Sequence, residues 1–246
     1  MIQDLHSHTY YSFCGIDDPR DVVEAAIAGG IELFGICDHN YGIGFGRHDV
    51  YSSKAVDFGN DYGRNLRRYF DHIDLIREKY ADKIRLLRGI EIATIMDGRL
   101  VLPENTDVSF FDYCLIEHID SPKSCTGGDI FEYAKKLKCP VGIAHTDLFA
   151  HAERLGITPK DYFAQMAENN IFWEMNVNYD STHRFREHAY VQRFFENEEQ
   201  QAVVKESGVR LSVGFDGHKC VEYSPERVKE YCRKIEQMGV TMAFDD

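Results

Sequence analysis

Two histidines near the start of the chain are spaced so that they could bind one metal ion together. His6 and His8 are separated by a single residue and follow an apolar segment that begins with Met1 and Ile2. In a β-strand, side chains two residues apart point to the same face, so both imidazoles would lie side by side. Neutral imidazoles are common ligands of zinc and other transition metals. One buried and one exposed histidine would give the same pattern, so the rest of the sequence must decide.

Histidines and carboxylates also follow the other apolar segments. We predict these segments to be strands, at residues 1–5, 33–37, 84–90, 113–116, 141–144, 171–175 and 209–213. The polar residues that follow them are His6 and His8, Asp38 and His39, Glu91, His118, His145, Glu174 and Asn176, and Asp216 and His218. The carboxyl ends of parallel strands meet at one rim of a barrel, where the active sites of such barrels lie. We therefore expect most of these side chains to form one site.

The chemistry of this set is that of a centre with more than one metal ion. It contains more ligands than one tetrahedral ion can use. A carboxylate such as Glu91 can bridge two ions, and such centres activate water and stabilise the attacking and leaving oxygens of phosphoryl transfer. The sequence has no nucleophile elbow and no Ser-His-Asp order. It therefore predicts metal-dependent hydrolysis rather than covalent catalysis by serine.

Helical segments separate the predicted strands. Three of them begin with an N-cap residue followed by proline, at residues 18–30, 158–166 and 224–239. Two longer helices are predicted at residues 61–80 and 187–206. Strands that alternate with helices indicate a parallel sheet, either a closed barrel or an open doubly wound sheet. A chain of 246 residues fits a single α/β barrel domain covering residues 1–246.

The charge and the cysteine content of the chain limit the kinds of binding partner and cell compartment that we expect. The formal charge of −13 argues against nucleic acid, which is bound mainly by Lys and Arg, although bound divalent ions would add positive charge at the site. The seven cysteines include no Cys-x-x-Cys pair, so we expect neither a disulfide framework nor a structural zinc knuckle, and a reducing cytoplasm fits best. We expect no secretory leader and no membrane segment. Nothing in the sequence indicates the oligomeric state.

Two long connections carry cations that could hold a substrate phosphate. Residues 41–60 are glycine-rich at their start and include Arg47, and residues 177–186 include His183, Arg184 and Arg186. Long connections in compact α/β domains are often substrate loops, although these could equally be inert insertions. The candidate phosphate-binding residues are Arg47, Lys123, Arg184 and Arg186, each of which could instead be a solvated surface cation.

The ordered series of motifs resembles that of the PHP family, which is named for polymerase and histidinol phosphatase. The series consists of His6-x-His8 with Ser12, Asp38-His39, Glu91, His118, His145 and Asp216-x-His218. The resemblance implies a distorted, TIM-like (β/α)7 barrel that holds two or three divalent ions, commonly zinc, manganese or iron. It spans nearly the whole chain.

The resemblance also implies which residue binds which ion. His6, His8, Glu91 and Asp216 would hold the first ion, and Glu91, His118 and His145 the second. His39, His218 and the residue six positions after His8 would hold the third. Family members often have a histidine at that last position, whereas this chain has Cys14, which could bind zinc as a thiolate or be a buried thiol. Ser12 and Asp17 are possible substitutes.

Several acidic or amide residues near the predicted ligands are not expected to bind a metal ion themselves. Asp38, Glu174 and Asn176 could orient ligand histidines, and Asp38 could equally cap a turn or helix. We expect Glu117 to point away from His118, because neighbouring residues of a strand face opposite sides.

The resemblance implies a phosphomonoesterase of the histidinol-phosphatase branch. The chain length and the Ser12-Phe13-Cys14-Gly15 segment favour that branch. Metal-bound hydroxide would attack a small phosphorylated substrate, with Asp216, His218 and Glu91 as the catalytic residues. The alternatives are an exonuclease-type phosphodiesterase, a metal-dependent amide hydrolase, and a metal-binding regulatory module without catalysis.

Overall fold

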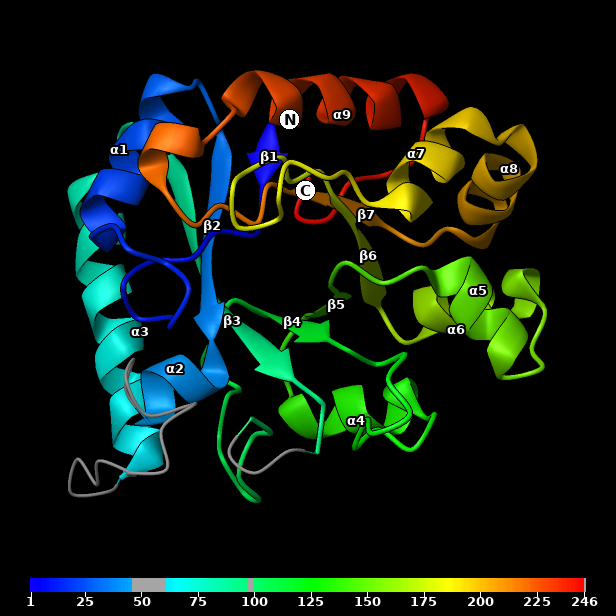
Figure 1. The fold of residues 1–246 in the computed structure, drawn as a ribbon, viewed down its shortest axis with the longest axis horizontal. Helices are drawn as coiled ribbons and strands as arrows, with labels where there is room; N and C mark the ends of the chain where they lie inside the picture. The colour runs from blue at the N-terminus through cyan, green and yellow to red at the C-terminus, as the bar shows by residue number, and fades with distance from the viewer. Residues whose placement is uncertain (46–60, 97–99, 246) are drawn as a thin grey trace.

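The protein is a parallel α/β barrel with helices around a ring of strands, as a computed structural model shows (Figure 1). The structure describes residues 1–45, 61–96 and 100–245. The seven strands pair in chain order, each parallel to the next. They are β1 (Gln3–Asp4), β2 (Leu33–His39), β3 (Arg85–Ala93), β4 (Tyr113–Glu117), β5 (Val141–Ile143), β6 (Ile171–Asn176) and β7 (Leu211–Gly214). The predicted strands and their parallel pairing are confirmed.

The first and last strands close the sheet into a nearly complete barrel rather than leaving it open. The backbone N–H of Leu5 donates a hydrogen bond to the carbonyl of Val213 over 2.8 Å. A parallel bridge joins Ser7 to Gly217. Because these contacts lie at and just beyond the ends of β1 and β7, the two predicted ligand motifs at opposite ends of the sequence become neighbours.

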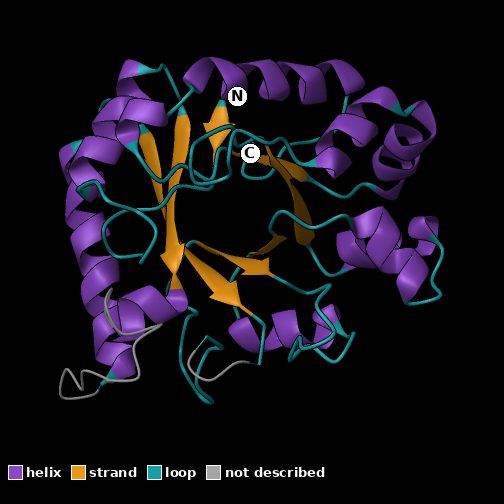
Figure 2. Ribbon diagram, in the orientation of Figure 1, coloured by secondary structure: helices purple, strands orange, loops and turns teal. Residues whose placement is uncertain are grey.

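The helices lie outside the strands (Figure 2). Those with clear sequence signals form as predicted: α1 (Pro19–Ala28), α3 (Tyr62–Lys79), α6 (Pro159–Glu168) and α9 (Pro225–Met238). Three of these begin at a side-chain cap, because Asp18 accepts from the N–H of Arg20, Asp61 from that of Arg64 and Thr158 from that of Asp161. The others are α2 (Asn40–Phe45), α4 (Ile130–Leu137), α5 (Leu148–Arg154), α7 (Ala189–Glu196), α8 (Glu198–Ser207) and the 3₁₀ turn η1 (Cys220–Glu222). No helix among the described residues is long and apolar enough to cross a membrane.

Two long segments differ from the prediction. The prediction of a single helix at residues 187–206 is wrong, because two helices lie there. Asn197 has φ −116° and ψ 101°, which ends α7. The side chain of Asn197 then accepts a hydrogen bond from the N–H of Gln200 and caps the start of α8. The connection expected at residues 41–60 begins inside helix α2. The rest of that connection, including Arg47, lies outside the described residues.

The barrel interior is apolar at one end and polar at the other. Leu5, Leu33, Leu115 and Phe172 belong to the interior cluster around Tyr113. The Tyr113 ring needs glycine on two neighbouring strands, since a Cβ at Gly35 or Gly89 would lie 2.1 Å or 2.4 Å from its atoms. The C-terminal segment covers the amino ends of the strands, where Gln3 donates to the carbonyl of Ala243. Polar side chains are therefore gathered at the carboxyl ends.

Candidate metal centre

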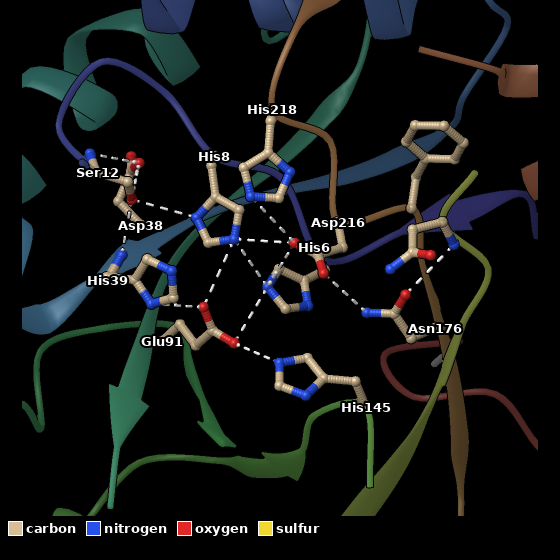
Figure 3. A network of polar contacts seen from close by, with 12 residues as sticks. His6, His8, Ser12, Asp38, His39, Glu91, His145, Asn176, Asp216 and His218 are labelled. Carbon is tan, nitrogen blue, oxygen red and sulfur yellow. Dashed lines mark hydrogen bonds and ion pairs between the residues drawn. The ribbon is translucent and has the colours of Figure 1, made fainter. Parts of the chain in front are cut away.

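Most of the predicted ligands converge at the carboxyl ends of the strands, and Figure 3 shows them as His6, His8, His39, Glu91, His145, Asp216 and His218. His6 and His8 present their Nε2 atoms to each other over 3.2 Å. The Nε2 of His8 lies 3.0 Å from Oδ1 of Asp216, and that of His6 lies 3.6 Å from the same oxygen. All three side chains are buried. Their ligand atoms lie within 4.8 Å of one another, which is compatible with one shared ion.

Glu91 occupies the middle of the cluster. Its side chain has no solvent exposure, its Oε2 lies 2.8 Å from Nδ1 of His39, and its Oε1 lies 3.1 Å from Nε2 of His145 and 3.4 Å from that of His6. Burial alone would raise the pKa of this carboxyl, but the imidazoles of His39 and His6 hold it well below its usual value. Glu91 is therefore ionised, and it is placed to bridge two ions.

Glu117 also belongs to the cluster, so the expectation that it points away from His118 is wrong. Glu117 continues the inward alternation of Tyr113 and Leu115, and its Oε2 lies 2.8 Å from Nε2 of His118. Its Oε1 lies 3.3 Å from Nδ1 of His39. Alternation fails at the next residue because His118 has a left-handed backbone (φ 61°), which turns its imidazole to the same side. The inward period of two was the available signal for Glu117.

His145 and Asp216 share this unusual backbone, with φ of 23° and 55°. Non-glycine residues rarely adopt positive φ, and those that do in folded proteins are often found at functional sites. In each case the residue follows a strand directly or nearly so. The backbone strain therefore coincides with predicted ligands.

Cys14 lies against a third part of the cluster. Its Sγ and a ring nitrogen of both His8 and His218 lie within 4.8 Å of one another. Burial would raise the pKa of the Cys14 thiol, but the charge of His8 and hydrogen bonds with His218 and His39 lower it to about 5. The thiolate is the form that binds metal. Asp17 instead accepts a hydrogen bond from the N–H of Cys220.

Carboxylates outside the ligand set hold the histidines in place. Oε1 of Glu174 lies 2.7 Å from Nδ1 of His6, and its Oε2 accepts from the backbone N–H of His145. This contact requires glycine at 214, where a Cβ would lie 2.0 Å from Oε1 of Glu174. Asn176 donates to both Glu174 and Asp216 over 3.3 Å. Glu174 and Asn176 thus contact the ligands as a supporting layer would.

Asp38 fixes the loop after β1 rather than a histidine directly. Its Oδ1 accepts from the N–H of Thr9 and the hydroxyl of Ser12. The Ser12 oxygen in turn accepts from the N–H of His39 and lies 3.2 Å from Nδ1 of His8. Ser12 and Asp38 therefore connect the first two strand ends.

Several buried polar atoms of the cluster have no hydrogen-bond partner in the described part of the chain. They are Nδ1 of His39, Oε2 of Glu91, Oδ2 of Asp180 and Nδ1 of His218. The first two lie 2.8 Å apart but are not aligned for a hydrogen bond. Leaving such atoms unpaired is costly, and cations between them would satisfy them. The residues present therefore fit a centre of more than one divalent ion.

A family model described as the PHP domain matches residues 4–238. The chain belongs to the PHP domain family. Its buried histidine–carboxylate clusters all lie within the residues that this family model matches.

Individual relatives of this PHP domain include histidinol phosphatases. The chain is 27% identical over 112 residues to a histidinol-phosphatase of Lactococcus lactis subsp. lactis (strain IL1403), an alignment that covers 46% of this chain and only 37% of the relative. The crystal structure of histidinol phosphate phosphatase from the same organism, complexed with zinc, L-histidinol and phosphate, superposes with a TM-score of 0.61 at 16% identity, covering 98% of this chain and 94% of that one. A structure from Listeria monocytogenes, assigned provisionally as a histidinol phosphatase, gives 0.53 at 14% identity, covering 90% and 97%. At these identities the superpositions show a shared fold.

The PHP domain has further site residues that the sequence did not single out as ligands. His183, in the loop after β6, places Nε2 3.2 Å from Oδ2 of Asp216, and Asp180 contacts both His183 and His218. The candidate phosphate-binding residues Lys123, Arg184 and Arg186 are exposed. Among the described residues, none of these three cations forms an ion pair, and Arg47 lies outside those residues.

Glutamine in place of Glu174 is expected to weaken the binding of one ion by about 10–100-fold, the usual effect of losing a residue that orients a ligand. Each oxygen of Glu174 faces a donor, on His6 and on His145, and an amide has only one oxygen to offer. Zinc affinity measured against a chromogenic chelator tests this, with Glu153→Gln on the exposed face of α5 as the control. Equal affinities for Glu174→Gln and the unmodified protein would contradict it.

Proposed function

We propose that this PHP domain hydrolyses a small phosphomonoester similar to histidinol phosphate. The observation that carries the proposal is the buried cluster centred on Glu91, whose carboxylate contacts the imidazoles of His39, His145 and His6 at one rim of the barrel. The proposal is also supported by the fold that this chain shares with a histidinol phosphate phosphatase, which was crystallised with zinc, L-histidinol and phosphate.

Three groups of side chains would hold the ions in this proposal. His6, His8 and Asp216 form the first with Glu91, and Glu91, Glu117, His118 and His145 form the second. His39, His218 and Cys14 form the third. The donors are mostly imidazole and carboxylate, which suit zinc, manganese or iron, and the thiolate of Cys14 favours zinc at the third position. Bound ions of this kind supply an activated water and neutralise charge on the phosphoryl oxygens.

The chain's own residues position this chemistry. With an ion bound, Glu174 would hold the remaining proton of His6 on Nδ1, which leaves the lone pair of Nε2 on the side of Glu91 and Asp216. Burial opposes ionisation of Asp216, but the imidazoles of His6 and His183 hold its pKa well below the usual value. We propose that Asp216 accepts the proton of the attacking water at a carboxylate oxygen, that the bond between phosphorus and the ester oxygen breaks, and that the proton then passes to the departing alkoxide. His218, with Nε2 3.8 Å from Asp216, and Glu91 complete the catalytic group.

Phosphate binding is assigned in this proposal to the rim cations Lys123, Arg184 and Arg186, together with Arg47. An exposed guanidinium can hold two phosphate oxygens at once. In a protein with a net charge of −13, a few local cations and the bound ions would have to attract the anionic substrate. A long nucleic acid strand would be repelled by the same charge.

Phosphate release by the metal-reconstituted protein tests the proposal. The substrates are histidinol phosphate, an aryl phosphate, nucleoside monophosphates and a single-stranded oligonucleotide. We expect release from the monoesters, fastest from histidinol phosphate. A Glu91→Gln preparation purified in parallel controls for contaminating phosphatases. If metal-loaded protein releases phosphate from none of the monoesters, the proposal is wrong. Cleavage of the oligonucleotide alone would show that the protein is a phosphodiesterase.

A further inference from the structure

A carboxylate in the loop after β6 contacts two histidines of the centre. Oδ1 of Asp180 lies 2.8 Å from Nδ1 of His183, and its Oδ2 lies 3.4 Å from Nδ1 of His218. Oδ1 also accepts from the backbone N–H of His183. Asp180 has no solvent exposure. The loop therefore places a buried carboxylate beside His183 and His218.

The two histidines turn their other nitrogens toward Asp216. Nε2 of His183 lies 3.2 Å from Oδ2 of Asp216, and Nε2 of His218 lies 3.8 Å from Oδ1. An imidazole whose Nδ1–H faces a carboxylate keeps its lone pair on Nε2, which is the usual arrangement of a metal-binding histidine and its supporting acid. His183 and His218 thus both lie between Asp180 and Asp216, and His183 makes the shorter contacts with each.

Unpaired atoms at this position also indicate a cation. Oδ2 of Asp180 and Nδ1 of His218 make no hydrogen bond within the described residues. Water cannot readily take the place of a partner, because His218 is only 5% exposed. Ligand atoms of Asp180, His183 and His218 all lie within 4.8 Å of one another. Neighbouring ligands of one tetrahedral ion lie roughly 3–3.5 Å apart, given metal–nitrogen bonds of about 2 Å.

We propose that the loop after β6 completes the cation position at His218, with His183 as a further ligand and Asp180 as the residue that positions both imidazoles. The proposal rests on the metal centre of the proposed function. It adds a ligand from a loop to a set that otherwise comes from strand ends and the segment after β1. It also gives the ion at His218 a further nitrogen donor, from His183.

The test is metal binding by His183→Asn. The asparagine amide can still donate to Asp180 where Nδ1 did, but nothing replaces the nitrogen that faces Asp216. Asp180→Asn removes the charge that positions both histidines, and Thr182→Ala, at an exposed residue of the same loop, is the control. Each protein is stripped of metal and titrated with zinc against a chromogenic chelator, and the cobalt-loaded form is compared by visible absorption.

We expect one ion to bind about 10–100-fold more weakly, or to be lost, in His183→Asn and in Asp180→Asn, with the remaining ions unchanged. The cobalt spectrum should change in both variants and stay the same in Thr182→Ala. Wild-type stoichiometry, affinity and spectrum in His183→Asn would overturn the proposal, whatever Asp180→Asn does. If Asp180→Asn does not fold, His183→Asn decides alone. Metal binding is measured without substrate, so failure of the proposed phosphatase activity is a separate result.

Discussion

Replacing Glu91 with glutamine is expected to lower kcat by about 10³-fold or more, because the ions that Glu91 helps to hold contribute several kcal/mol of charge stabilisation. The substitution keeps the shape of the side chain and removes its charge. Glu91 lies within 2.8–3.4 Å of nitrogens on His39, His145 and His6, so the amide would place N–H groups against ligand atoms. Both neighbouring cation positions would be weakened together.

Two measurements on the same preparations check this expectation. Phosphate release from the best substrate gives kcat, and inductively coupled plasma mass spectrometry gives the metal content per chain. Glu153→Gln, on the exposed face of α5, carries the same chemical change outside the site and should behave as the unmodified protein. A Glu91→Gln protein with normal metal content and a kcat within tenfold of normal would show that Glu91 does not bridge ions.

Removing the metals is expected to destabilise the protein, and the size of the effect should grow with pH. Ions that bind only the folded state add about 4 kcal/mol to the free energy of unfolding when free zinc exceeds its dissociation constant 1,000-fold. Protons compete with metals for the same imidazoles, so the ions bind more tightly as pH rises.

The metal-free protein should show the opposite pH dependence. Burial lowers the pKa of a histidine, but contact with Glu91 raises that of His145 to about 9, and contact with Asp180 and Cys14 raises that of His218 to about 10. A pKa that is raised by folding contributes stability that is complete below the unfolded value of about 6.5 and is lost as pH rises through the folded value. The metal-free protein should therefore lose stability between about pH 6.5 and 10.

Thermal unfolding of chelator-treated and zinc-loaded protein across pH 6 to 10 measures both trends. We expect the two melting temperatures to be closest near pH 6 and to separate steadily above it. A metal-free protein reloaded with zinc must regain the higher melting temperature, which separates metal loss from damage by the chelator. Coinciding melting curves at every pH would show that the clusters do not hold ions in the folded protein.

The strand ends were predictable because parallel strands buried on both faces appear as continuous apolar runs, and their carboxyl ends must meet. His6, Glu91 and Asp216 follow from that rule alone. The direction of Glu117 relative to His118 was predicted wrongly because strand alternation stops at His118. The sequence around His118 gives no sign that its backbone is left-handed. The break at Asn197 was open to prediction, since Asn197 followed by two glutamates is a good helix start.

Loop residues were harder to predict for a different reason. Periodicity places a residue on one face of a strand or helix, but it does not say how a connection such as residues 177–186 folds. His183 was visible as a titratable residue, and Asp180 lies three positions before it. Only the fold of the loop shows that the two side chains meet each other and Asp216. The roles of Arg184 and Arg186 stay predictions.

The contact between the first and last strands joins two ends of the sequence that must meet before the first cation position is complete. The N–H of Asp216 donates to the carbonyl of His6, so residues from opposite ends of the sequence share one corner of the centre. Contacts between distant residues form late, because a long loop must close before they are made. A chain still lacking β7 has most of the histidines but no completed first cation position. We therefore expect His6, His8 and Asp216 to hold an ion together only after the barrel has closed.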